Sequence, residues 1–146
     1  MKKNVVIISG YFNPIHIGHV RLIKSSKELG DYLIVIVNND KQQILKKGKI
    51  IMDENERMEI VKMISGVDEV VLSIDEDKTQ CKTLEMLAKK HKGDSLIFSN
   101  GGDRDSEKAI PETDVCKKNN VEMKFGIGGD DKPNSSSNIN KLLGVE

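Results

Sequence analysis

Short runs of apolar, β-branched residues alternate along the chain with longer stretches in which apolar residues recur every three or four positions. The short runs have the length of buried strands, and the longer stretches have the spacing of amphipathic helices. Strands are expected at residues 5–9, 33–37, 67–72, 95–99 and 121–125. Helices are expected at residues 19–29, 54–65, 79–91 and 135–143, with a short one opening at Pro111.

This alternation is typical of parallel strands joined by helical crossovers. Because the strands are apolar on both faces, we expect an α/β, Rossmann-like, open parallel five-stranded sheet with helices on both faces. Ligands bind at the carboxyl ends of the strands in such sheets. Two segments that follow expected strands show the weakest signs of regular structure, and these are residues 39–49 and 126–134. They are either binding loops or plain surface loops.

Length and charge narrow the possible functions. A chain of 146 residues fits a single domain, residues 1–146, with one active site. Its 23 Lys and Arg residues balance 23 Asp and Glu residues, so no overall positive field draws it to nucleic acid or to an anionic membrane. No apolar run has the length of a membrane span or of a secretion signal, and we expect a cytoplasmic protein. Cys81 and Cys116 stand outside any metal-ligand spacing, so the sequence predicts neither a protein-bound metal nor a disulfide.

The candidate chemistry gathers where the first strand ends, between Ser9 and His19. This stretch leaves a strand and enters a helix, whose free N–H groups and positive dipole end favour phosphate. His16 and His19 lie three residues apart, so near a helix start they point to the same side, where two imidazoles can donate to phosphate oxygens. Gly18 leaves room for a triphosphate against the backbone. Alternatively, the histidines only cap or pack the helix, or form half of a metal site.

The segment Gly10-Tyr11-Phe12-Asn13, followed by His16-Ile17-Gly18-His19, resembles the HxGH motif of the HxGH nucleotidyltransferase superfamily. The resemblance extends through residues 29–35, Arg57 and residues 67–71, and points to the branch of glycerol-3-phosphate cytidylyltransferase and heptose-1-phosphate adenylyltransferase. It implies transfer of a nucleoside monophosphate from an NTP, CTP first and ATP second, to a phosphorylated small-molecule acceptor, with release of pyrophosphate. It also implies Mg²⁺ as a cofactor and a homodimer.

Two residues depart from the family pattern. Tyr11 stands where the family usually has a threonine that helps bind the triphosphate, and Asn13 stands where it usually has an aspartate. Pro14 is closer to adenylyltransferases of the nicotinamide mononucleotide type. The letters of residues 16–19 also match the HIGH motif of class I aminoacyl-tRNA synthetases. We reject that reading because the chain has no room for tRNA-binding domains, and the echo of their lysine–serine loop at residues 62–65 falls inside an expected helix.

The resemblance also assigns the charged groups that bind phosphate. Lys46 is the best match to the lysine that clamps the phosphates, ahead of Lys47 and Lys49, and is expected to be catalytic together with His16 and His19. Arg57 either reaches the pyrophosphate or pairs with Asp53 or Glu54. A second anion site is expected at the start of the last helix, in Ser135, Ser136 and Ser137, although serine is also a common helix N-cap. Lys132 replaces the arginine that usually precedes this cluster.

A glycine-rich turn after the fourth strand completes the expected site. Asp103 is expected to contact nucleotide and acceptor, and Arg104 the acceptor phosphate, although a plain Asn-Gly turn needs no ligand. The expected nucleotide-binding set is Gly10, Tyr11, Phe12, Gly18, Arg57, Gly102, Asp103, Ser135, Ser136 and Ser137, and the substrate set is Asn13, Asp103 and Arg104. Because a phosphate already attacks well, catalysis is positioning and charge neutralisation. A nucleotide-binding module without catalysis and a plain α/β interaction domain are the rival functions.

Overall fold

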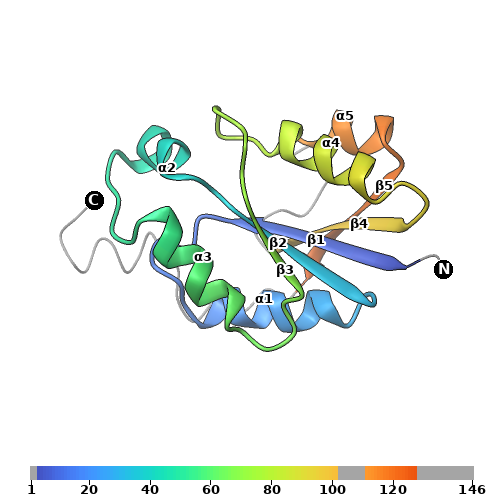
Figure 1. Cartoon of the computed structure of the whole chain (residues 1–146), viewed down its shortest axis with the longest axis horizontal. Helices are drawn as coiled ribbons and strands as arrows, with labels where there is room; N and C mark the ends of the chain where they lie inside the picture. Colours follow the sequence, from blue (N-terminus) through green and yellow to red (C-terminus); the bar gives the residue numbers. More distant parts are fainter. Residues whose placement is uncertain (1–2, 102–110, 128–146) are drawn as a thin grey trace.

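The computed structural model describes residues 3–101 and 111–127. Within these ranges the strands form one five-stranded sheet: β1 (Asn4–Gly10), β2 (Tyr32–Val37), β3 (Glu69–Leu72), β4 (Ser95–Gly101) and β5 (Val121–Ile127). The strand order is β3-β2-β1-β4-β5 (Figure 1). Every neighbouring pair is parallel, so the predicted open parallel sheet is confirmed.

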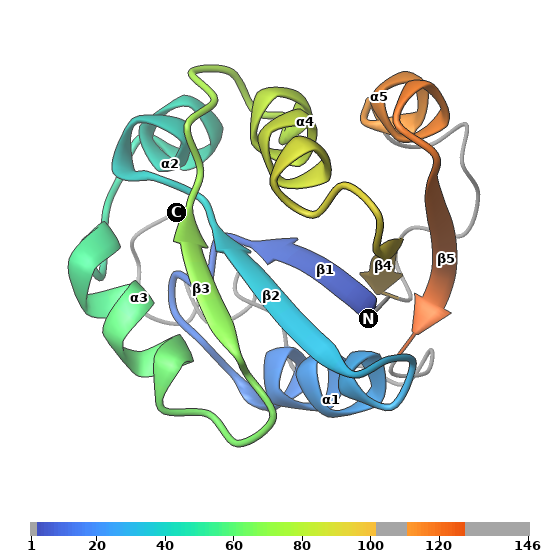
Figure 2. The same cartoon turned by 45° about the vertical axis from the view of Figure 1, so that its right-hand side comes forward.

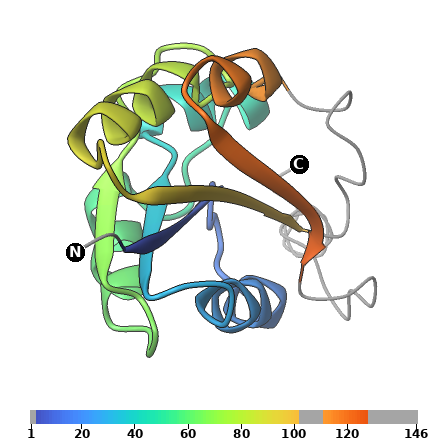
Figure 3. The ribbon, with the colours of Figure 1, turned by 90° about the vertical axis from the view of Figure 1, so that its right-hand side faces the viewer.

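Helices cover both faces of this sheet, and five are seen in the described residues: α1 (Ile17–Lys27), α2 (Asp40–Lys47), α3 (Glu54–Lys62), α4 (Cys81–Lys90) and α5 (Thr113–Lys118). α1 and α3 lie on one face, while α4 and α5 lie on the other (Figure 2). Figure 3 shows the same layers from another side, with α1 below the sheet and α4 and α5 above it. The predicted Rossmann-like layering is therefore confirmed.

The hydrophobic core lies on both faces of the sheet, because successive side chains of each strand point to opposite faces. In β1, Val6 and Ile8 pack with Ile23 of α1 and with other residues on that face, whereas Val5 and Ile7 pack on the face of α4 and α5. All four β1 side chains are 0% exposed, and each buried aliphatic side chain stabilises the fold by about 1.5–3 kcal/mol. Burial on both faces explains the continuous apolar runs of the sequence.

The strand order places the candidate site. From β1 the chain crosses to β2 and β3 on one side and then returns to β4 and β5 on the other. The winding direction of the sheet therefore changes between β1 and β4, and ligands bind at the carboxyl ends of the strands at such a switch point. The loop that follows β1 ends at His16, and His19 lies in the first turn of α1, so the expected chemistry lies at this point of the fold.

The expectation of an irregular segment at residues 39–49 is wrong, because α2 occupies most of it. Asn39 caps the helix by accepting from the Gln42 N–H at 2.8 Å, and the Gln42 side chain accepts from the Asn39 N–H at 3.0 Å. Gly48 ends the helix with a φ of 75°, in the left-handed conformation that favours glycine. This reciprocal capping stabilises a helix whose sequence carries little hydrophobic signal.

Other differences concern the ends of the expected elements. The last strand runs to Ile127, two residues beyond its expected end, and so includes the start of the expected segment 126–134. The expected helix at residues 135–143 lies outside the described residues. Over the ranges that the structure covers, the helices are too short or too polar to pass through a membrane.

Candidate active site

The loop between β1 and α1 is fixed by Phe12, which folds back into the core. Phe12 is 1% exposed, has a φ of 52°, and packs with the apolar residues between the sheet and α1. Its ring covers Gly10, where an added Cβ atom would lie only 2.8 Å from the Phe12 Cζ atom. The edge of the same ring contacts His19, with 4.8 Å between the two centroids. Core packing therefore sets the position from which the histidines project.

His16 and His19 form a reciprocal cap at the start of α1. His16 is the N-cap residue, and its Nδ1 atom accepts from the Gly18 N–H at 3.0 Å. The backbone N–H of His16 in turn donates to the Nδ1 atom of His19 at 3.1 Å. Because both Nδ1 atoms accept hydrogen bonds, the proton of each neutral ring is assigned to Nε2. Each ring thus carries an N–H donor on the atom opposite the helix cap.

The two imidazoles lie together, with their centroids 3.9 Å apart and their planes inclined by 32°. The structure therefore brings the two expected catalytic residues to one place, and it shows that they also cap the helix. The two roles are compatible, because capping uses Nδ1 and leaves Nε2 as the donor. Phosphate binding by this pair stays a prediction.

Gly18 is required by the His16 ring. A Cβ atom at Gly18 would lie 2.8 Å from the Cε1 atom of His16, which is closer than real contacts allow. From the sequence, this glycine is expected to leave room for a triphosphate. The structure adds an internal reason, since any side chain here would push the imidazole out of its capping position.

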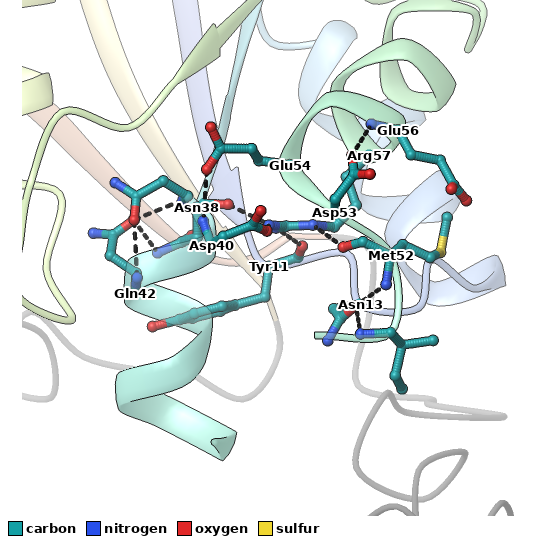
Figure 4. Close-up of polar contacts among 12 residues, drawn as sticks. Tyr11, Asn13, Asn38, Asp40, Gln42, Met52, Asp53, Glu54, Glu56 and Arg57 are labelled. Carbon is teal, nitrogen blue, oxygen red and sulfur yellow. Dashed lines mark hydrogen bonds and ion pairs between the residues drawn. The ribbon is translucent and has the colours of Figure 1, made fainter. Parts of the chain in front are cut away.

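Arg57 donates hydrogen bonds to four groups from three segments of the chain around this loop (Figure 4). Its Nη1 atom donates to the carbonyl oxygens of Tyr11 at 2.7 Å and Asn38 at 2.6 Å. Its Nε atom donates to the carbonyl oxygen of Met52 at 2.8 Å, and its Nη2 atom donates to the Asp40 carboxylate at 2.8 Å. The Arg57 side chain is 0% exposed. In this structure it holds the backbone of the site and offers no surface to a nucleotide.

This arrangement corrects the two roles expected for Arg57. Its ion-pair partner is Asp40 rather than Asp53 or Glu54. Asp53 instead caps α3, where it accepts from the Glu56 N–H at 2.8 Å, and Glu54 accepts from the Asp40 N–H at 2.9 Å. Asp40 was missed by the sequence analysis, although an acidic residue just after a buried strand lies at the ligand-binding edge of the sheet.

Asn13 lies in the loop between β1 and α1, residues 11–16, which we call the histidine loop, and it connects this loop to the segment before α3. It is 2% exposed, and its Oδ1 atom accepts from the backbone N–H groups of Ile51 at 3.1 Å and Met52 at 2.8 Å. An aspartate oxygen would accept the same two bonds, so the departure from the family pattern preserves this contact. The oxygen that was expected to contact substrate is thus engaged in holding the loop.

Lys46 lies in the last turn of α2 and reaches the loop after β1. Its Nζ atom is 4.2 Å from the centroid of the Tyr11 ring, within the range of a cation–π interaction. The structure therefore brings the expected lysine beside the histidine loop, on a helix rather than on an irregular loop. Tyr11, which also departs from the family pattern, contributes the aromatic face that contacts the Lys46 ammonium.

The other expected site residues lie outside the described part of the chain: Gly102, Asp103, Arg104, Lys132, Ser135, Ser136 and Ser137. The strand that leads to the first three is described. There Asn100, which is 3% exposed, donates from Nδ2 to the carbonyl oxygens of Phe98 at 3.2 Å and Lys124 at 3.1 Å. These bonds fix the carboxyl end of β4 against β5, at the edge of the sheet where ligands are expected.

Comparison with known proteins defines the class of this fold and site. The family model described as "Cytidylyltransferase-like" matches residues 7–139. This range includes the histidine loop, α2 and the whole described sheet from Ile7 onward. The chain therefore belongs to the cytidylyltransferase-like family, as the resemblance of the HxGH segment implied.

Individual relatives point to a narrower group within the family. An FAD synthase from Thermococcus sibiricus is 34% identical over 119 residues, covering 81% of this chain and 76% of the relative. An FAD synthase from Ferroglobus placidus is 46% identical over 77 residues, covering 53% of this chain. Against several of these curated relatives the matched part spans only about half of the relative's length.

A solved structure supports the same fold. The lipopolysaccharide core biosynthesis protein from Thermoplasma volcanium superposes with a TM-score of 0.70 and 28% identity, covering 88% of this chain and 99% of that one. The two curated relatives above are named FAD synthases, and these names favour transfer of AMP from ATP over transfer of CMP from CTP. The homodimer, the Mg²⁺ cofactor and the cytoplasmic location stay predictions.

Proposed function

We propose that this chain is an adenylyltransferase that joins the AMP part of ATP to the phosphate of flavin mononucleotide, or of a closely similar phosphorylated acceptor, and releases pyrophosphate. The observation that carries the proposal is the histidine pair at the start of α1, just after the central strand, in which both Nδ1 atoms accept backbone N–H groups and the proton of each neutral ring is assigned to Nε2. The choice of ATP and of a flavin acceptor rests on the names of the relatives.

In the proposed reaction an acceptor phosphate oxygen attacks the α-phosphorus of ATP in line. A bond forms between that oxygen and the α-phosphorus. The bond from the α-phosphorus to the oxygen that bridges the α- and β-phosphates breaks, and this oxygen leaves with the pyrophosphate. No proton has to be removed, because the acceptor phosphate is already an anion. His16 and His19 stabilise the charge on the phosphate oxygens through their Nε2–H groups, and Lys46 neutralises the leaving pyrophosphate.

The surface beside the histidine loop supports an acceptor with an apolar ring system. Ile44 and Leu45 of α2 are 52% and 51% exposed, and Ile50 and Ile51 after that helix are each 38% exposed. The hydrogen bond from Ile51 to Asn13 places this segment against the loop that carries the histidines. Exposed large apolar side chains beside a site indicate a ligand or partner surface. The dimethylbenzene part of a flavin ring is flat and apolar and suits contact with side chains of this kind.

In the proposed reaction Mg²⁺ would bind together with the nucleotide. In residues 3–101 and 111–127, His, Cys, Asp and Glu side chains do not gather in threes as a metal cage would require. We therefore derive no step through a protein-bound metal. Mg²⁺ prefers water and phosphate oxygens and needs few protein ligands, so it would be held by the triphosphate.

The test is pyrophosphate release from each of the four NTPs against a panel of acceptors. The panel contains flavin mononucleotide, nicotinamide mononucleotide, glycerol 3-phosphate, phosphorylated sugars and amino-alcohol phosphates. We expect release only with ATP and flavin mononucleotide, together with a new product that co-migrates with FAD. Release that requires CTP and another acceptor would restore the cytidylyl reading. Nucleotide binding without release from any pair would favour the non-catalytic module.

A further inference from the structure

α2 is held at its start by a contact with α3 and at its end by a contact with the loop after β1. At its start the Asp40 carboxylate pairs with the buried Arg57 guanidinium, and at its end the Lys46 ammonium lies over the Tyr11 ring. The same guanidinium donates to the carbonyl oxygen of Tyr11. Arg57 therefore contacts both the helix bearing the lysine and the residue whose ring contacts that lysine.

We propose that Arg57, acting through Asp40 and Tyr11, is the positioning residue that holds Lys46 over the Tyr11 ring, in the loop that leads to the histidines. The proposal rests on the proposed function only for its effect on turnover. Arg57 itself contacts neither nucleotide nor acceptor, because its side chain is fully buried and its guanidinium donates to four groups of the protein.

The geometry makes Lys46 sensitive to the tilt of α2. Lys46 lies six positions after Asp40, which is about 9 Å along the helix axis at about 1.5 Å per residue. A tilt of about 10° around the start of the helix would move the lysine by about 1.5 Å. A displacement of about 1 Å in a catalytic group costs up to roughly a hundredfold in rate. Two further contacts resist such a tilt, the bond from the Asp40 N–H to Glu54 and the bond from Gln42 to the carbonyl oxygen of Asp77.

Burial strengthens the Arg57 contacts. The Asp40 side chain is 28% exposed, so the pair is partly shielded from water. Removing one partner from such a pair leaves the other charge uncompensated and weakens the anchor. Asp40→Asn is the milder change, because the amide oxygen still accepts a hydrogen bond while the charge is lost. Arg57→Lys is the stronger change, because ammonium cannot reproduce the planar set of donors.

The first measurement reads the position of Lys46 directly by NMR. The ε-methylene protons of a lysine held over a tyrosine ring are shielded by the ring current, and a Lys46→Arg variant identifies the signal. Thermal unfolding confirms that each variant is folded. We expect the shielding to be lost in Asp40→Asn and to persist in Lys41→Ala, a control on the same helix whose exposed contact with Glu76 is 3.8 Å long. Unchanged shielding in folded Asp40→Asn would overturn the proposal.

The second measurement is a double-mutant cycle on turnover. If Asp40 and Arg57 act through the lysine, Asp40→Asn lowers kcat by about tenfold to a hundredfold in the wild-type background and has little further effect in Lys46→Ala. Equal losses in both backgrounds would show a structural role and overturn the coupling. If the wild-type protein shows no transfer with any acceptor, the proposed reaction fails, while the NMR measurement still decides whether Arg57 positions the lysine.

Discussion

The backbone N–H of His16 donates to the Nδ1 atom of His19 at 3.1 Å, so the helix cap and the orientation of the histidine rings are one structural feature. The Nδ1 atom of His16 completes the pair by accepting from Gly18 at 3.0 Å. Each imidazole thus has one nitrogen committed to the fold and a second that carries the proton. Substitutions that mimic one nitrogen at a time should separate stability from catalysis.

Asparagine and glutamine provide that separation at His16. In His16→Asn the short amide places an acceptor near the position of Nδ1 but has no donor at the position of Nε2. We expect this variant to keep nearly the wild-type thermal midpoint and to lose on the order of a hundredfold to a thousandfold in kcat. Thermal unfolding and steady-state kinetics of the purified variant measure the two quantities.

His16→Gln serves as the matched control, because its longer amide carries a donor near Nε2 and loses the cap. We expect it to lose about 1 kcal/mol of stability, as for other removed N-caps, and to retain more turnover than His16→Asn. The reverse order of turnover would contradict the assignment of the catalytic donor to Nε2.

Gly18→Ala tests the contact between the glycine and the His16 ring. Alanine inside a helix normally stabilises by about 1 kcal/mol relative to glycine. Here its Cβ atom would meet the imidazole at 2.8 Å, so we expect the ring to move and kcat to fall by at least about tenfold. Gly93→Ala is the comparison, since Gly93 has a φ of 99° and nothing within 4 Å of an added Cβ atom. That variant should lose stability and keep its turnover.

The sheet was predictable from the sequence because its strands are buried on both faces and leave uninterrupted apolar runs. α2 was not predictable in this way, because Ile44 and Leu45 are its apolar residues and both are half exposed. Its stability comes from capping and from distant contacts, such as the bonds from the Gln42 Nε2 atom to the carbonyl oxygens of Asp77 at 2.7 Å and Thr79 at 2.9 Å. Contacts between residues so far apart leave no local pattern.

The site shows the same limit. His16, His19 and Lys46 were found because their types and spacing match a family motif, and the structure places them near one loop. The burial of Arg57 was not foreseen, because an arginine on a helix is ordinarily exposed. It is buried here because Tyr11, Asn38 and Met52 direct their carbonyl oxygens toward one point, and that convergence exists only in the folded chain.

Asn13→Asp tests whether the departure from the family pattern matters for the loop. Either an amide or a carboxylate oxygen accepts from the N–H groups of Ile51 and Met52, so we expect Asn13→Asp to fold with a similar midpoint. Asn13→Ala leaves both N–H groups without this acceptor and should cost about 1–3 kcal/mol for each group that stays buried. Denaturant unfolding measures both variants. Equal stability of Asn13→Ala and the wild type would contradict the role given to this oxygen.

We expect the deprotonation of Tyr32, which lies far from the candidate site, to lower the free energy of unfolding at alkaline pH. The Tyr32 hydroxyl donates to the Glu69 carboxylate at 2.7 Å. This bond, together with burial and the negative charge of Glu69, raises the pKa of Tyr32 to about 12, from an ordinary value of about 10. The folded state therefore favours the protonated phenol. Its contribution is complete below about pH 10 and is lost as the pH rises from about 10 to 12.

The difference in unfolding free energy between the wild type and Tyr32→Phe isolates this contribution from the deprotonation of lysines, which both proteins share. We expect the wild type to be the more stable protein at pH 8, and its advantage to shrink steadily between about pH 10 and 12. Absorbance at the tyrosinate band, followed in the same titration, should give a late transition that is missing in Tyr32→Phe. A constant difference across this range would mean that the bond to Glu69 does not hold the proton on Tyr32.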